Sequence, residues 1–153
     1  MKKQSNLAQQ LAKNSLSIIS LVIALIALTY NTWRSNTTEL NRNYRNASFE
    51  LILQLSELQS ITNDLHFNVP SLSSPDWQMH HNKSLIDGWS NIALIEDLSE
   101  LLPTSFQKQA EQLKAVWKKH HTLLGEHNQA EQLISNAITQ MRKETRYFLR
   151  TLD

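Results

Sequence analysis

Six histidines are the side chains best suited to chemistry, because imidazole binds metal ions and exchanges protons near neutral pH. They are His66, His80, His81, His120, His121 and His127. Metal sites in helical bundles usually take Glu-x-x-His motifs from two helices, and this sequence has none. Adjacent histidines on a helix also point about 100° apart, so a His-His pair does not face one ion. We therefore expect no metal site.

Carboxylates that could serve acid–base chemistry are grouped at Glu96, Asp97 and Glu100, near the end of a predicted helix. Such a group is more often a solvated helix edge than a catalytic pair. The sequence also has no cysteine, no Gly-x-Ser-x-Gly motif and no glycine-rich turn that could hold a phosphate. We predict that the protein is not an enzyme and that it holds no cofactor.

The segment LKAVWKKHH combines basic and aromatic residues, with Lys114 and Lys118 on either side of Trp117 and Lys119 next to them. Such a segment could bind nucleic acid or anionic lipid headgroups. Lysines balanced by acids elsewhere are more often a solvated edge. The chain carries 15 Lys and Arg against 14 Asp and Glu, so we expect no nucleic-acid partner.

The elements that carry these residues follow an apolar run, SLSIISLVIALIALTYNTW, which extends from Ser15 to Trp33 without a charged residue. A helix of about 20 residues spans about 30 Å, the thickness of a bilayer's hydrocarbon core. We predict a transmembrane anchor over residues 14–34, preceded by a short basic segment at 1–13. The lipid bilayer is therefore an expected partner.

The far end of this run has the composition of a membrane–water interface. Tyr30 and Trp33 lie about one helical turn apart, and amphipathic aromatic rings are enriched at headgroup level. Arg34 ends the uncharged run and is expected among the headgroups. These three residues are the predicted interface anchors.

Two other interpretations of the apolar run remain open. A cleavable signal peptide needs a small-x-small site after its apolar core, and only Ala27-Leu28-Thr29 approximates one. A buried core helix could also be this apolar, although aromatic and basic flanks are unusual for one.

The basic residues on either side of the run predict its orientation. They are Lys2, Lys3 and Lys13 before it, and Arg34, Arg42 and Arg45 after it. The positive-inside rule counts Lys and Arg near the span, and the two sides are almost balanced. The free amino group and the absence of acids before the span favour a cytoplasmic N-terminus, with the body on the other side.

One face of the predicted span carries small residues, Ser17, Ser20, Ala24 and Ala27, spaced 3-4-3. Small residues let transmembrane helices approach closely, so this strip is a possible contact face for another membrane protein or a second copy. Ser and Ala are also ordinary residues in membrane spans.

Beyond the anchor, residues 35–153 are predicted to form a helical bundle. No Gly or Pro precedes Pro70, so the anchor helix is expected to continue into the bundle. The predicted helices are about 35–67, 75–102, 105–124 and 129–152. Short later connections favour antiparallel neighbours, so the predicted fold class is all-α, with an N-terminal transmembrane helix continuing into an antiparallel four-helix bundle.

Each predicted helix has an apolar stripe. The first stripe is Leu40, Tyr44, Ala47, Leu51, Gln54, Leu58, Ile61 and Leu65. The second helix has a wide apolar arc, Leu85, Ile86, Trp89, Ile92, Ala93, Leu94, Ile95, Leu98, Leu101 and Leu102. The third has Phe106, Ala110, Leu113, Trp117, His120 and Leu124, and the fourth has Ile134, Ile138, Met141, Thr145, Phe148 and Leu152. Trp117 is expected in the core beside Trp89 and Phe148.

Helix ends are predicted from capping residues. Thr104 with Gln107, and Asn128 with Glu131, have the spacing of capping boxes. Gly125 suits a left-handed cap after the third helix.

Two stretches, YNTWRSNTTELNRNYRNASFELILQLSELQ and GWSNIALIEDLSELLP, resemble a group of small, uncharacterised single-pass membrane-anchored helical proteins of proteobacteria. The resemblance implies membrane anchorage, a helical body and a location in the bacterial inner membrane. In that membrane, the orientation predicted from the flanking basic residues would make the body periplasmic. It implies no activity, because none is known for the group.

The predicted function is contact: a membrane-anchored helical interaction protein, acting as an accessory or scaffold subunit. The alternative is a ligand-sensing helical bundle coupled to a partner protein. A sensor needs a polar cavity, and the polar residues on the stripes that could line one are Gln54, His120 and Thr145. A scaffold needs an exposed apolar patch or a paired span instead.

Overall fold

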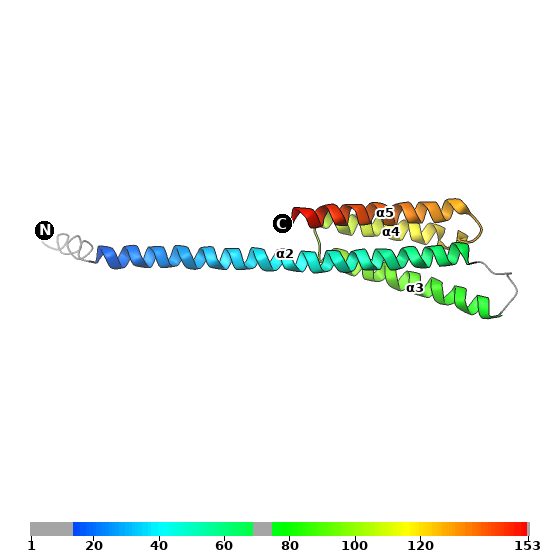
Figure 1. Cartoon of the computed structure of the whole chain (residues 1–153), viewed down its shortest axis with the longest axis horizontal. Helices are drawn as coiled ribbons and strands as arrows, with labels where there is room; N and C mark the ends of the chain where they lie inside the picture. The colour runs from blue at the N-terminus through cyan, green and yellow to red at the C-terminus, as the bar shows by residue number, and fades with distance from the viewer. Residues whose placement is uncertain (1–13, 69–74, 153) are drawn as a thin grey trace, which may run out of the picture. The chain divides into compact units, whose positions relative to one another are not determined.

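The computed structural model describes residues 14–68 and 75–152, and this part of the chain contains helices and no strand. The helices are α2 (Ser15–Phe67), α3 (Pro75–Glu100), α4 (Thr104–His120) and α5 (Asn128–Thr151), with a 3-10 turn η1 (His121–Leu123) after α4. Figure 1 shows this order along the chain. The predicted all-α fold is confirmed.

The chain divides into two compact units, Met1–Asn41 and Arg42–Asp153, and the division falls inside α2. In the second unit, the remainder of α2 and helices α3, α4 and α5 form an antiparallel four-helix bundle (Figure 1). The absence of Gly and Pro from α2 explains why one helix continues across the division.

The core of the bundle follows the predicted stripes on α4 and α5. Phe106, Ala110, Leu113 and Trp117 are buried on α4, and Ile134, Ile138, Met141 and Thr145 are buried on α5. Burying one large apolar side chain contributes about 1.5–3 kcal/mol, so these two stripes supply much of the driving force for folding.

The predicted stripe on α2 is correct at Ala47, Leu51, Leu58, Ile61 and Leu65, which are buried. It is wrong at Leu40, which is 49% exposed, and at Gln54, which is half-buried and donates from Nε2 to Glu50 Oε1 at 2.7 Å. The buried positions Leu51, Leu55, Leu58, Thr62 and Leu65 also keep the 4-3 spacing of a heptad. The buried face of α2 is therefore turned toward Leu55 and Thr62, away from Gln54.

The wide apolar arc predicted for α3 is also only partly buried. Ile92, Ile95 and Leu102 lie in the core, but Ile86, Leu94 and Leu101 are exposed. The stripe that α3 buries is completed by smaller residues, Ser84, Gly88, Asn91 and Ser99. The core therefore uses a narrower face of α3 than its apolar residues indicated.

Trp117 and Gly88 form a close contact between α4 and α3. The Trp117 side chain is 0% exposed, as predicted. A Cβ atom added at Gly88 would lie 2.3 Å from Cζ2 and 2.7 Å from Cη2 of this indole. Glycine weakens a helix by about 1 kcal/mol relative to alanine, and here that cost is offset because the indole occupies the space of the missing side chain.

The predicted neighbours of Trp117 are only partly correct. Its indole stacks on the His121 ring, with centroids 5.7 Å apart, and Trp89 contacts the same imidazole edge-on at 5.3 Å. Phe148 instead packs against Phe106, at 5.3 Å. Phe106 is 11 residues before Trp117, or about 16 Å along α4, so placing Phe148 beside Trp117 was wrong.

Helix ends agree with the predictions at one cap and differ at two. Gly125 has φ 89°, the left-handed conformation expected of it. Thr104 does not cap α4, because the helix begins at that residue and its N-cap, Pro103, has no side-chain acceptor. Asn128 likewise lies inside the first turn of α5 after His127. Neither predicted capping box forms.

Gly88→Ala should destabilise the full-length protein by about 1–3 kcal/mol, because the new methyl group overpacks an enclosed indole. At an exposed helix position the same change would stabilise by up to about 1 kcal/mol. Urea unfolding in detergent micelles, followed by circular dichroism, measures the difference. In a Trp117→Ala background, which alone should cost about 3–5 kcal/mol, Gly88→Ala should become neutral or stabilising.

The control is Ser90→Ala on the exposed face of the same helix, which should change stability by less than about 0.5 kcal/mol. A Gly88→Ala protein as stable as its parent would contradict the described contact.

Candidate functional site

Helix α2 contains a stretch that, by length and composition, is long and apolar enough to cross a membrane. None of this stretch is buried against the other residues that the structure describes. A core helix of a soluble protein would be mostly buried, so this interpretation of the run is not supported. The preceding lysines, Lys2, Lys3 and Lys13, lie outside the described residues.

The hydroxyl groups within this stretch bond to their own helix. Ser20 Oγ donates to Leu16 O at 2.8 Å, Thr29 Oγ1 donates to Leu25 O at 2.8 Å, and Thr32 Oγ1 donates to Leu28 O at 2.9 Å. An unpaired polar group costs several kcal/mol in hydrocarbon. These bonds make the helix surface compatible with lipid despite its Ser and Thr residues.

The four small residues of the predicted contact face, Ser17, Ser20, Ala24 and Ala27, are all exposed on α2. The Ser20 hydroxyl already has a backbone acceptor. This face therefore favours a partner helix mainly by letting the two backbones approach closely, and less by forming a new hydrogen bond.

The predicted interface anchors follow this face along the helix. The Tyr30 and Trp33 rings are 55% and 64% exposed, and their centroids lie 6.2 Å apart. Arg34 is exposed one residue later. The aromatic pair and the cation thus occur together on α2, where the apolar stretch ends.

His66 is the most buried of the described histidines. It lies near the end of α2, 9% exposed, and its Nδ1 accepts from Gly125 N–H at 3.1 Å. A backbone amide can only donate, so the neutral ring carries its proton on Nε2, which donates to Asn128 Oδ1 at 3.1 Å. The imidazole thereby joins the end of α2 to the connection between α4 and α5. Sequence spacing could not show this role.

The other histidines have separate surroundings, except that His120 and His127 line the same groove. His80 Nδ1 lies 3.7 Å from Asp64 Oδ2, His121 packs against Trp117, and His120 and His127 line a surface groove at the turn between α4 and α5. Within residues 14–68 and 75–152, no three His, Asp or Glu side chains lie close enough to hold a metal ion.

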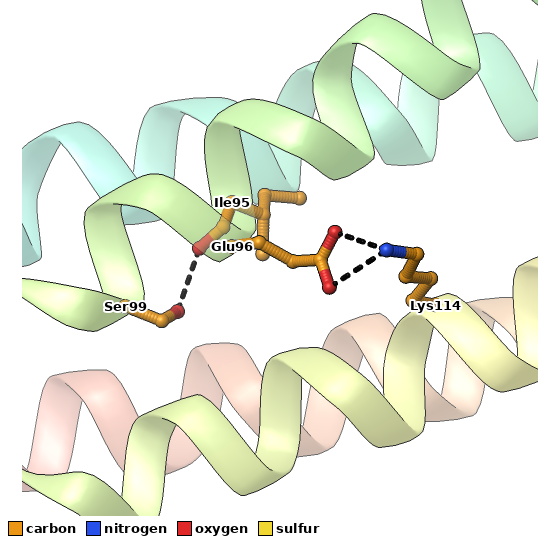
Figure 2. Close-up of polar contacts among 4 residues, drawn as sticks. All are labelled: Ile95, Glu96, Ser99 and Lys114. Atoms are coloured by element: carbon orange, nitrogen blue, oxygen red, sulfur yellow. Dashed lines mark hydrogen bonds and ion pairs between the residues drawn. The ribbon is translucent and has the colours of Figure 1, made fainter.

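Of the three grouped carboxylates on α3, Glu96 forms an ion pair with α4, whereas Asp97 and Glu100 are exposed. Lys114 Nζ on α4 donates to both carboxylate oxygens of Glu96, at 3.1 and 2.8 Å, and Figure 2 shows this pair bridging the two helices. Nearby, Ser99 Oγ donates to Ile95 O at 2.6 Å. The LKAVWKKHH segment therefore does not form a basic–aromatic surface, because Trp117 faces the core and Lys114 pairs with Glu96.

The three polar residues that could have lined a sensing cavity have separate environments. Gln54 bonds to Glu50 on its own helix, and the buried Thr145 Oγ1 donates to Met141 O at 2.8 Å. His120 lies in the groove at the other end of α4. The structure does not assemble a polar cavity from these side chains.

A basic surface on α5 was missed in the sequence. Arg142, Lys143, Arg146 and Arg150 line one shallow groove together with Thr139 and Tyr147. The signal was the spacing of four between Arg142, Arg146 and Arg150, which places all three on one side of a helix. We call Lys143, Arg146, Tyr147 and Arg150 the α5 basic face.

Arg142 lies at the inner edge of the groove. Its Nη2 donates to Leu55 O of α2 at 3.0 Å. Burial, and then the neighbouring charge of Arg146, lower the pKa of the Arg142 guanidinium below its usual value. This residue therefore ties α5 to α2, while the other cations of the groove point outward.

Comparison of the chain with protein-family models, curated proteins and solved structures finds no match. The resemblance to proteobacterial membrane-anchored proteins therefore stays a prediction.

His66→Ala should cost about 1–3 kcal/mol of unfolding free energy, because it leaves the Gly125 amide and the Asn128 side chain without their buried partner. Asn128→Ala should cost less, since His66 keeps its bond to Gly125. The neighbouring exposed His127→Ala serves as control and should change stability by under about 0.5 kcal/mol. Equal stabilities for His66→Ala and His127→Ala would refute the described bonds.

Proposed function

We propose that this protein is a single-pass membrane-anchored helical protein that acts by contact, as an accessory or scaffold subunit. The observation that carries the proposal is the apolar stretch of α2, which is long enough to cross a bilayer and is not covered by any other described residue. The internally bonded hydroxyls and the Tyr30–Trp33–Arg34 group support the same interpretation.

The polar residues of the bundle favour a role in binding over one in catalysis. His66 and Glu96, the residues whose types are commonest in active sites, are both used to join helices. A ligand-sensing role would need a shared polar cavity, and Gln54, His120 and Thr145 give it no support.

The location follows from the sequence rather than from the fold. The resemblance favours a bacterial inner membrane, and the basic segment before the span favours a periplasmic body. A C-terminal reporter that is active only in the periplasm reads this orientation directly. If a C-terminal reporter that works only in the cytoplasm is active instead, the proposed orientation is wrong.

The partner proposed for the span is a second transmembrane helix, from another membrane protein or another copy of this chain. Because the chain contains no cysteine, single cysteines can be placed without background. Ala24→Cys and Ala27→Cys lie on the small-residue face, whereas Val22→Cys and Ile26→Cys lie on the opposite side of the same turns.

Mild oxidation of native membranes should cross-link the Ala24→Cys and Ala27→Cys proteins several-fold more than the two control variants. A product of twice the chain mass indicates self-association, and a different mass indicates another protein. Uniformly low cross-linking at all four positions would contradict contact through this face.

A further inference from the structure

The α5 basic face carries charge that the rest of the bundle leaves uncompensated. Lys143, Arg146 and Arg150 are exposed, and none of them pairs with a carboxylate in the part of the chain that the structure describes. The nearest acid on the same helix, Glu144, accepts from Gln140 at 3.0 Å and lies about 100° around the helix from Lys143. Tyr147, 67% exposed, lies among the three cations.

Three acids of the bundle line a different groove. Glu96, Glu100 and Glu111 lie between α3 and α4, where Glu96 is paired with Lys114. The acids of α5 itself, Glu131 and Glu144, accept hydrogen bonds from Ser135 and Gln140. Among the described residues, none of these carboxylates pairs with a cation of the α5 basic face.

The basic face lies at the end of the second unit where the chain arrives from the anchor. Arg45 Nη2, near the start of this unit, donates to Leu152 O just after α5, at 2.9 Å. Arg42 follows Arg34 by eight residues, and eight residues reach at most about 28 Å even when fully extended. If Arg34 lies among headgroups, as the proposed function requires, chain connectivity keeps Arg42 within about 28 Å of the membrane surface.

We propose that the α5 basic face binds the anionic headgroups of the membrane in which the chain is anchored. The inference rests on the proposed function and adds a second, electrostatic contact with the bilayer. Lys and Arg side chains interact favourably with acidic headgroups, and tyrosine is enriched at the level where headgroups meet water. Both residue types occur together on this face.

The experiment uses the full-length chain in vesicles of phosphatidylcholine, with or without phosphatidylglycerol. A fluorophore on Tyr147→Cys reports contact through quenching by nitroxide-headgroup lipids. Its matched control is a fluorophore on Ser105→Cys, which is exposed on α4 at the same end of the bundle, since Phe106 packs against Phe148. Adding phosphatidylglycerol should increase quenching at position 147 but not at 105. About 1 M NaCl, which shortens the screening length to roughly 3 Å, should reverse the increase.

Reversing the three cations, Lys143→Glu, Arg146→Glu and Arg150→Glu, should lower the ratio of docked to undocked protein by roughly 100-fold or more. The matched variant, Lys108→Glu, Lys118→Glu and Lys119→Glu, makes the same charge change on exposed positions of α4 and should keep the quenching.

Quenching at position 147 that ignores phosphatidylglycerol, or survives the α5 reversal, would overturn the proposal. Quenching that instead rises with protein density and not with lipid charge would assign the face to an acidic protein surface, and the lipid proposal would be wrong. Flotation of the protein with the vesicles separates these failures from failure of the anchor: a chain that does not float refutes the proposed function itself.

Discussion

The apolar surface of α2 before Arg34 is the constraint on which this account depends. Nine Leu, Ile and Val side chains between Leu16 and Leu28 are exposed, and nothing in the described residues 14–68 and 75–152 covers them. At about 1.5–3 kcal/mol each, transferring them from water contributes on the order of 10–25 kcal/mol. That equals or exceeds the whole stability of a typical domain, about 5–15 kcal/mol. Such a surface requires an apolar environment, and a bilayer matches its length.

The later part of α2, after Arg42, lies in a different environment. After Arg42, one stripe of α2 is buried against its own bundle, and Arg142 and His66 hold it there through hydrogen bonds to and from other helices. Helical continuity, which needs only the absence of Gly and Pro, lets one element carry both surfaces. A contact protein needs little more than this: a fixed anchor and a folded surface at its end.

The sequence predicted the fold because helical periodicity is local. The stripes on α4 and α5 lie where spacing placed them, and Trp117 is in the core. The errors in the predicted core arose at positions where tertiary packing, and not local spacing, decides which side chain is buried. Leu55, and not Gln54, faces the core, because the buried face of α2 is turned toward Leu55 and Thr62. The Trp117 indole fills the space left by Gly88 on α3, and no spacing rule predicts a contact between residues so far apart in the sequence.

Some candidate sites could likewise be predicted from local sequence, whereas others depend on tertiary contacts. The apolar stretch of α2 and its Tyr30–Trp33–Arg34 end were visible in composition alone. The bonds of His66 were not, because its partners lie about sixty residues away in the sequence and belong to a turn. The α5 basic face was visible in the spacing of its arginines, but it became meaningful only once the structure showed Lys143, Arg146 and Arg150 exposed and without a paired carboxylate among the described residues.

Extraction of native membranes with alkaline carbonate tests the central claim most directly. The full-length protein should stay in the membrane pellet, whereas Val22→Arg with Ile26→Arg should release it, because each arginine at mid-span costs about 2.5–3.5 kcal/mol. The same pair of arginines at Leu53 and Ile86, which are exposed on the bundle, should leave it in the pellet. Release of the unaltered protein by carbonate would contradict the account.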